Sequence, residues 1–194
     1  HNGGAISGSQ VSKAINCTFK NNHAYTFGGA SDKIQAYNCT FEYNSAEIDG
    51  GALFECDAIN CVFVHNFAHY GGAMTNGNSR DCTFIKNTAS VMGGGQHNGK
   101  AVNCVFIGNE AQASAYAGQG GGFSSGTAVN CTFINNTAKE GDGMYSGYSL
   151  LSTFQDNTYL YTTILVPTIE VDSEINANVG DTLFFNLIYN NLRR

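Results

Sequence analysis

Apolar and polar residues alternate in short stretches of this chain, and glycine-rich segments separate the stretches. In residues 14–19, the apolar residues Ile15, Cys17 and Phe19 occupy every second position. The same alternation recurs at Tyr37–Phe41 and at Val102–Phe106. An apolar residue at every second position predicts a half-buried β-strand. Glycine pairs interrupt the chain too often for an amphipathic helix, so the pattern predicts an all-β protein.

The strands belong to a sequence repeat. The pattern Phe-x-x-Asn occurs seven times, and successive phenylalanines lie 22, 22, 21, 22, 27 and 21 residues apart. The phenylalanines are Phe19, Phe41, Phe63, Phe84, Phe106, Phe133 and Phe154. The asparagines are Asn22, Asn44, Asn66, Asn87, Asn109, Asn136 and Asn157. A cysteine precedes each of the first six phenylalanines by two residues, at Cys17, Cys39, Cys61, Cys82, Cys104 and Cys131.

The repeat predicts a stacked fold. A glycine pair follows most copies, as at Gly50-Gly51, where a second short strand is expected after a sharp turn. One such unit cannot bury its own apolar face, whereas units stacked about 4.8 Å apart can. We therefore predict a right-handed, single-stranded parallel β-helix of about seven coils, with cysteines and phenylalanines inside. Each repeat asparagine is expected at a turn, bonded to backbone groups and to asparagines of adjacent coils.

The repeat gives way to a different pattern near the end of the chain. We assign residues 1–160 to the β-helix, residues 161–167 to a linker that ends at the only proline, Pro167, and residues 168–194 to a short β segment. That segment predicts two strands around Val179-Gly180-Asp181 and resembles the opening of an immunoglobulin-like module. Two strands are too few for a sandwich of roughly seven. They are alternatively capping strands or donor strands for another chain.

The repeat motifs resemble those of known surface proteins. Gly3-Gly4-Ala5-Ile6 and Phe-x-x-Asn resemble the repeats of the chlamydial polymorphic membrane proteins. The fuller form, Asn-Cys-Thr-Phe-x-x-Asn-x-Ala followed by Gly-Gly-Ala, is similar to adhesin-like surface proteins of methanogenic archaea and some gut bacteria. The resemblance covers roughly residues 1–160 and implies a β-helix displayed outside the cell for attachment. It transfers no binding residues, because the shared residues are architectural.

Charge and composition limit the classes of partner that the chain is expected to bind. Charged residues make up 12% of the chain, the net charge is -6, and no basic cluster precedes the terminal Arg193-Arg194. Nucleic acid and direct membrane insertion are therefore not expected. We expect an extracellular adhesin-type module without a cofactor, whose partner is a protein or glycan on a host or neighbouring cell. Further domains of the same chain, or copies of it, are the other expected partners.

The seven cysteines leave three alternatives. We favour a column of buried, reduced thiols that pack as small apolar groups. Disulfides between adjacent coils are the second alternative, although the stacked Cβ atoms would lie farther apart than a relaxed disulfide prefers. A metal site is the third, and the sequence has no Cys-x-x-Cys pair to support it. Cys56 lies off the column, and the sequence assigns it no role.

A carbohydrate-active enzyme is the rival function. Polysaccharide lyases and hydrolases need carboxylates or bases clustered on one face. The candidates are Asp32, Glu55 and Asp57, with His97 and Lys100 two coils on. No coil stacks two carboxylates with a basic partner, so we interpret these residues as solvated surface charge and do not expect catalysis.

Other polar residues give weaker signals. His65 and His69 flank a turn and are interpreted as exposed histidines, with a shared ligand as the alternative. Asn-x-Thr acceptor sites for glycans occur at Asn16, Asn38, Asn130 and Asn135. Three of these four asparagines are expected within strands, with their side chains facing outward.

One coil is longer than the others. Five extra residues lie between Phe106 and Phe133, within residues 110–119. Insertions in solenoids form loops on one face, often the binding face. The candidate ligand-facing residues are Gln112, Ser114, Tyr116 and Gln119. A tolerated bulge without function is the alternative that we favour.

The ends of the chain predict a completing partner. A β-helix exposes unpaired strand edges at each end unless something covers them. We expect either that this sequence is an excerpt of a larger surface protein, which we favour, or that subunits assemble end to end as an extracellular fibre.

Overall fold

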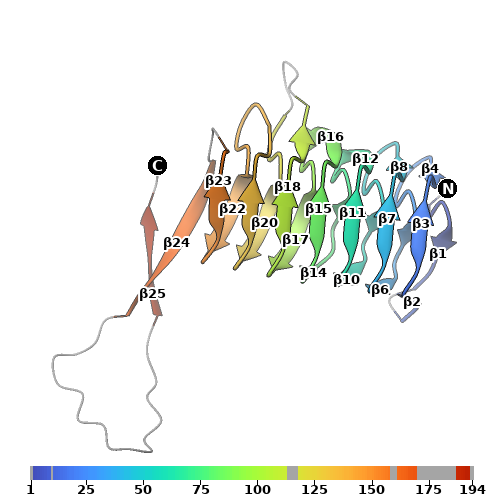
Figure 1. The fold of residues 1–194 in the computed structure, drawn as a ribbon, viewed down its shortest axis with the longest axis horizontal. Coiled ribbons are helices and arrows are strands. Elements are labelled where there is room, and N and C mark those ends of the chain that lie inside the picture. The colour runs from blue at the N-terminus through green and yellow to red at the C-terminus, as the bar shows by residue number, and fades with distance from the viewer. Residues whose placement is uncertain (1, 10, 113–117, 158–160, 170–186, 193–194) are drawn as a thin grey trace, which may run out of the picture.

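The computed structural model describes residues 2–9, 11–112, 118–157, 161–169 and 187–192. All regular structure in these ranges is β-strand, and the strands stack into a β-helix of about seven turns (Figure 1). The predicted all-β fold and the parallel β-helix are therefore confirmed. Three sheets run along the rod, and successive coils add strands to them; sheet B has seven strands and sheet C has five.

Two of the sheets are made of short parallel strands. Sheet B contains β3 (Thr18–Lys20), β7 (Thr40–Glu42), β11 (Val62–Val64), β15 (Thr83–Ile85), β18 (Val105–Ile107), β21 (Thr132–Ile134) and β23 (Thr153–Gln155). Sheet C contains β4 (His23–Ala24), β8 (Ser45–Ala46), β12 (Phe67–Tyr70), β16 (Thr88–Met92) and β19 (Glu110–Ala111).

Sheet A is built from two strands per coil in the first coils and from one longer strand in the later ones. The first column contains β1 (Ile6–Ser7), β5 (Ser31–Asp32), β9 (Leu53–Phe54) and β13 (Met74–Thr75). The second column contains β2 (Lys13–Ile15), β6 (Gln35–Tyr37), β10 (Asp57–Ile59) and β14 (Ser79–Arg80). The longer strands are β17 (Gln96–Val102), β20 (Phe123–Val129) and β22 (Met144–Leu150). The first half of β17 pairs with β13 and the second half with β14, so one strand replaces the pair.

The chain continues beyond the seventh phenylalanine as strand. β24 (Tyr161–Ile169) pairs in parallel with β22, and β25 (Leu187–Leu192) pairs antiparallel with β24. The segment 161–167, predicted as a linker, thus lies within β24 and continues sheet A. The cysteine and the glycine pair of the repeat are missing there, and residues 161–167 do not alternate between apolar and polar, so the repeat pattern does not mark this strand. The predicted Val179-Gly180-Asp181 turn lies outside the described residues.

The corners of each coil are residues with left-handed backbone. In the second coil they are Lys33, Asn38 and Tyr43, with φ of 56°, 52° and 52°, followed by Gly50 with φ of 63°. Equivalent residues in the other coils have the same sign of φ, and many are asparagine or glycine, which adopt this conformation at low cost. Four sharp corners per coil turn the short strands around the core.

Phenylalanine rings fill the centre of the rod. The seven rings stack with centroids 4.6–5.0 Å apart and planes within 9° of parallel. The middle five rings, from Phe41 to Phe133, are fully buried. Register fixes this column, since each phenylalanine is the direct β-sheet partner of the next. Each of the middle five rings therefore buries a large apolar surface against two identical neighbours.

The repeat asparagines form a second interior column. The Nδ2 atom of Asn66 donates to Oδ1 of Asn87 at 2.9 Å and to the carbonyl of Phe41 at 2.9 Å. The backbone N–H of Asn66 donates to the same Oδ1 at 2.9 Å. This unit repeats from Asn22 to Asn157 and satisfies buried polar groups at each corner.

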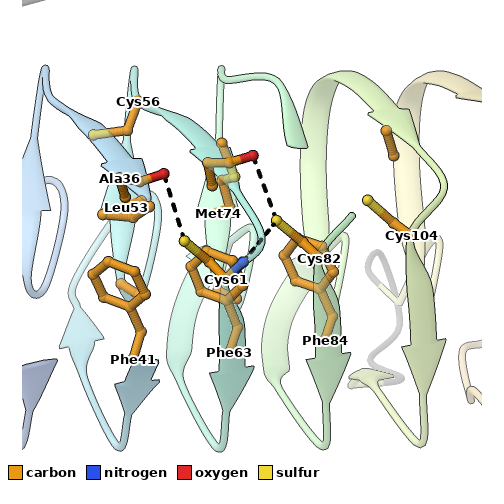
Figure 2. Close-up of a cluster of buried hydrophobic side chains, with 14 of the residues drawn as sticks. Ala36, Phe41, Leu53, Cys56, Cys61, Phe63, Met74, Cys82, Phe84 and Cys104 are labelled. Carbon is orange, nitrogen blue, oxygen red and sulfur yellow. Dashed lines mark hydrogen bonds between the residues drawn. The ribbon is translucent and has the colours of Figure 1, made fainter. Parts of the chain in front are cut away.

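The cysteines lie beside the phenylalanine column (Figure 2). All seven are free thiols, and all except Cys17 are buried. Each buried thiol of the column donates to a carbonyl two residues earlier, as Cys61 does to Ile59 at 3.3 Å. Burial raises the pKa of Cys39, and it raises the pKa of the off-column Cys56 to about 12. Cys56 packs inside the rod against Ile34, whose N–H donates to its Sγ at 3.3 Å.

Two expected side-chain positions differ from the structure. Ile15 was predicted to face the core, yet it is 54% exposed while its neighbour Ala14 is buried. The left-handed Asn16 separates β2 from β3, so the alternation does not run through 14–19 as one strand. Cys17 was expected inside the rod and is exposed, because no preceding coil among the described residues covers it.

Candidate functional site

The long strands of sheet A in the later coils, β17, β20 and β22, each contain a glycine near the middle. Gly99 has φ of 96° and Gly147 has φ of 119°. The equivalent Gly126 follows Ser125, which has φ of 57°. A Cβ atom on Gly147 would lie 2.1 Å from the carbonyl oxygen of Gly126 in the coil below. Only glycine permits this close approach of the two coils, and Gly126 and Gly147 both line a hollow on the surface of the sheet.

One hollow of about 350 Å³ lies over β10, β14 and β17. Its polar side chains come from three successive coils: Asp57, Asn78, Arg80 and Lys100. The apolar part of its lining comes from Ala58, Ile59 and Val102. A second hollow of about 550 Å³ lies over β20 and β22 and is lined by Ser125, Gly126, Thr127, Ser146, Gly147 and Tyr148.

The two hollows lie over neighbouring strands of sheet A and are linked by one column of residues. Lys100 of the first hollow is the β-sheet partner of Thr127, and Thr127 is the partner of Tyr148. We call the two hollows and this column the sheet A groove. Its polar and aromatic residues are Asp57, Asn78, Arg80, Lys100, Ser125, Thr127, Ser146 and Tyr148. It runs parallel to the rod axis across five coils.

The groove holds two cations that lack an acidic partner. Elsewhere in the described ranges, Lys20 pairs with Glu42 at 2.9 Å and Lys33 pairs with Glu55 at 3.9 Å, whereas Lys13 and Lys86 make no ion pair and lie apart from one another. Arg80 and Lys100 are exposed and make no ion pair with any described residue.

The carboxylate of Asp57 is held by its neighbour. Its Oδ1 accepts the backbone N–H of Asn78 at 3.1 Å and the Nδ2 of the same residue at 3.0 Å. Among the residues that line the groove, Asp57 is the one carboxylate, so the groove carries two positive charges and one negative charge.

A third hollow, of about 270 Å³, lies where sheet C turns into sheet A. It is lined by Asp49, Tyr70, Thr75, Asn76, His97 and Asn98. The Nδ1 atom of His97 is 2.7 Å from the hydroxyl oxygen of Ser124. Burial lowers the pKa of His97, and burial raises the pKa of Asp49 against the opposing charge of His69. Ser124 is fully buried, so this serine–histidine pair positions the imidazole and offers no accessible nucleophile.

The five candidate catalytic residues lie in different places. Asp32 is buried in the second coil, and its Oδ1 has no hydrogen-bond partner among the described atoms. Glu55 lies at a corner beside Lys33. Asp57 and Lys100 share the sheet A groove, whereas His97 lies in the third hollow. Of the five candidates, the structure therefore brings together only Asp57 and Lys100, and Arg80 lies in the same hollow.

Two of the four candidate loop residues can be placed. Gln112 is exposed, and its backbone N–H donates to the carbonyl of Ala89 at 2.8 Å. Gln119 is half-buried and donates through Nε2 to Glu140 at 2.9 Å. Ser114 and Tyr116 lie outside the described residues.

The remaining polar candidates lie at corners. His65 has φ of 53° and stacks on Tyr43 with ring centroids 5.1 Å apart, whereas His69 lies on strand β12. Within the described ranges, no three His, Cys, Asp or Glu side chains form a group suited to a metal ion. The acceptor asparagines Asn16, Asn38, Asn130 and Asn135 are exposed, and all four have left-handed backbone. None lies within a strand, because each forms a corner.

Sequence reasoning missed most of the groove. Asn78, Arg80, Thr127 and Tyr148 were not singled out, because each is an ordinary polar residue in its own coil. The usable signal was positional: residues 57, 78, 100, 127 and 148 follow one another at steps of 21, 22, 27 and 21, which are the steps of the later phenylalanines. An outward column at the repeat spacing is a surface feature that single residues do not reveal.

Comparison with known proteins identifies the repeat. A model of the Chlamydia polymorphic membrane protein repeat matches residues 16–30 and 38–54, which are 15 and 17 of the 194 residues. This match supports the resemblance to polymorphic membrane protein repeats, and no match supports the resemblance to archaeal or gut-bacterial proteins. A search of curated proteins found none that matches this chain.

The repeat and the fold together bear on the kind of protein to which this chain is similar. Polymorphic membrane protein repeats suggest outer-membrane or surface proteins, and a β-helix that carries them is consistent with an adhesin-like surface repeat protein. In the part of the chain that the structure describes, no helix is present that could cross a lipid bilayer.

Proposed function

We propose that this chain is an extracellular, adhesin-type module that binds a ligand on a cell surface through the sheet A groove. The observation that carries the proposal is the pair of exposed cations, Arg80 and Lys100, which lie in a hollowed polar surface without an acidic partner. Exposed charges on a folded surface cost little when they are solvated, so the chemical setting of the two cations decides what they can bind. Its place beside a continuous row of hydroxyl and amide groups supports ligand recognition.

The scaffold suits a binding surface. Backbone hydrogen bonds, stacked rings and the asparagine column fix each coil on the next, so the outward side chains stand at set positions. A ligand that meets positioned side chains loses less free energy to ordering them. The core columns place no demand on the outward residues, which are therefore free to vary with the ligand.

The outer face of sheet B is a poorer candidate. Its outward residues are mostly β-branched, as in Val62, Val64, Ile85 and Ile107, and the three hollows described above lie on other faces. A flat, weakly polar strip of this kind offers few groups that could orient a ligand.

A binding role is favoured over an enzymatic one. General acid–base hydrolysis of a glycoside uses two carboxyl groups on either side of the bond. Asp57 is the one carboxylate of the groove, and Asn78 occupies one of its oxygens. This arrangement supports recognition and gives no pair of groups for hydrolysis.

Adhesion of coated beads tests the proposal. Beads that carry the chain should adhere to cells of at least one type in a broad panel, and Thr127→Tyr should reduce adhesion because the larger side chain fills the groove. The matched control is Thr83→Tyr, which places the same side chain on the outer face of sheet B. Equal adhesion by both variants, or no adhesion by the unchanged chain, would contradict the proposal. Release of sugar from a polysaccharide would replace it with the enzymatic function.

A further inference from the structure

We propose that the ligand of the sheet A groove is an acidic oligosaccharide that lies along the rod axis. In this arrangement Arg80 and Lys100 contact its carboxylate or sulfate groups, and the hydroxyl and amide side chains contact its hydroxyls. The inference rests on the proposed function and adds the chemical class of the ligand.

The charges of the groove favour an anion. Arg80 and Lys100 contribute two positive charges, and Asp57 contributes one negative charge, so the groove has a net charge of +1 in a chain of net charge -6. The excess of positive over negative charge is therefore local to this surface. The guanidinium of Arg80 presents paired N–H donors that match the two oxygens of a carboxylate or sulfate. Lys100 adds a second cation on the adjacent coil, diagonal to Arg80 in the sheet.

The backbone under the groove is already paired, which argues against a peptide ligand. β14 pairs with β10 and β17, and β20 pairs with β17 and β22. A peptide that adds a strand to a sheet needs free backbone N–H and C=O groups at an edge. These strands lie in the interior of sheet A, so side chains alone are available to recognise a ligand.

The spacing and chemistry of the side chains suit a sugar chain. Successive coils are about 4.8 Å apart, which is close to the length of one sugar ring. Each coil therefore presents one outward polar residue for each ring of an oligosaccharide that follows the rod. Asn78, Ser125, Thr127 and Ser146 supply amide and hydroxyl groups that both donate and accept hydrogen bonds.

The two ends of the groove have distinct roles. Tyr148, which is 55% exposed, lies at one end and offers an aromatic ring on which the apolar face of a sugar can stack. Asp57 lies at the other end and accepts hydrogen bonds from Asn78 through Oδ1. In the proposed complex its Oδ2 accepts a sugar hydroxyl, and its negative charge disfavours an anionic group at that position.

Calorimetric titration with defined oligomers tests the ligand class. The probes are galacturonate hexamers for carboxylate, heparin hexasaccharides for sulfate, maltohexaose as the neutral sugar and poly-glutamate as the acidic peptide. We expect binding of one or both acidic sugars that weakens as salt is raised, since exposed charges are screened over about 10 Å at 0.1 M salt. Maltohexaose and poly-glutamate should bind at least tenfold more weakly.

Charge-removing variants test the residues. Arg80→Gln and Lys100→Gln should each weaken binding of the acidic sugar about tenfold, as expected for a charged hydrogen bond. Arg80→Lys should restore part of the loss, because it retains the charge without the paired donors. The matched control is Lys86→Gln, which removes the same charge at an exposed corner between β15 and β16 and should leave binding unchanged.

Several results would overturn the inference. These are equal binding of maltohexaose or poly-glutamate, absence of binding by both acidic sugars, or equal binding by the Arg80→Gln, Lys100→Gln and Lys86→Gln variants. Bead adhesion separates this failure from failure of the proposed function. If the beads adhere and Thr127→Tyr blocks them while acidic sugars do not bind, the function stands and the ligand class is wrong.

Discussion

Removing one amide from the asparagine column should destabilise the whole rod. Asn87 is fully buried and makes four side-chain hydrogen bonds. Its Oδ1 accepts the backbone N–H and the Nδ2 of Asn66, each at 2.9 Å. Its Nδ2 donates to the carbonyl of Phe63 and to Oδ1 of Asn109, each at 3.0 Å. Asn87→Ala removes all four bonds and leaves the buried N–H of Asn66 without a partner.

The magnitude follows from these contacts. A net contribution of about 1 kcal/mol for each hydrogen bond gives about 4 kcal/mol for the four. The unpaired backbone N–H of Asn66 adds about 1–3 kcal/mol of desolvation. The expected loss in free energy of unfolding is therefore about 5–7 kcal/mol, which is comparable with the total stability of many domains.

Urea unfolding followed by circular dichroism measures this loss. Asn78→Ala is the matched control, because its exposed amide makes one side-chain bond and the change should cost about 0.5 kcal/mol. Asn87→Asp separates hydrogen bonding from packing: it keeps the shape but loses the two donors, and it should destabilise at pH 7 as much as alanine does. Losses of less than about 2 kcal/mol for both variants at position 87 would refute the reasoning.

Three further outcomes can be measured on the same protein. Gly72→Ala should prevent stable folding, because a Cβ atom would lie 2.2 Å from the backbone oxygen of Gly94. In Gly108→Ala the Cβ atom meets nothing closer than 3.5 Å, so this control should cost only about 1 kcal/mol for its positive φ. Thermal unfolding compares the two variants, and similar melting temperatures would contradict the steric argument. Thiol titration should find one rapidly reacting group, Cys17, in the native chain and seven after denaturation; rapid reaction of several native thiols would show that the column is accessible. The free energy of unfolding should fall as the pH drops below 6.5, the ordinary pKa of histidine, because burial lowers the pKa of His97 and the unfolded chain then binds more protons. Unfolding in urea at pH 7.5 and pH 5.0 measures this change. A pH dependence left unchanged by His97→Asn would show that other groups cause it.

The sequence predicts the interior of the rod well because register repeats there without error. A parallel coil has to place Phe63 beside Phe41 and Phe84 if all three are buried, and a slip of one residue would turn every side chain outward. The role of the asparagines follows in the same way, since an amide at a buried corner needs partners above and below. The β-helix and its interior columns can therefore be predicted from composition and from the spacing of the repeat.

The corners were harder to predict. Alternation through residues 14–19 suggested one strand with Ile15 inside, whereas the left-handed Asn16 ends one strand and starts another. Asparagine tolerates this backbone, but Tyr43 and His65 adopt it as well, with φ of 52° and 53°. Tertiary stacking imposes the corner on whatever residue occupies it, so local preference alone does not mark every turn.

The candidate site could be predicted only in part. Asp57 and Lys100 were named as polar candidates, but the sequence alone grouped Lys100 with His97, which lies in a different hollow. The hollow lined by Gly126 and Gly147 involves two coils that approach each other closely, and the sequence does not show that approach. Surface chemistry on a solenoid comes from neighbours in adjacent coils, so it emerges after the coils have been placed in register.

The most direct test of the account is to locate the bound ligand on the rod. Nuclear magnetic resonance spectra of ¹⁵N-labelled chain would be recorded during titration with the acidic hexasaccharide that binds in calorimetry. If the ligand binds in the sheet A groove, the backbone signals of Asn78, Lys100 and Thr127 should shift together, whereas those of Val64 and Ile85 on sheet B should remain in place. Shifts centred on sheet B or sheet C, with the signals of the sheet A groove unchanged, would contradict it.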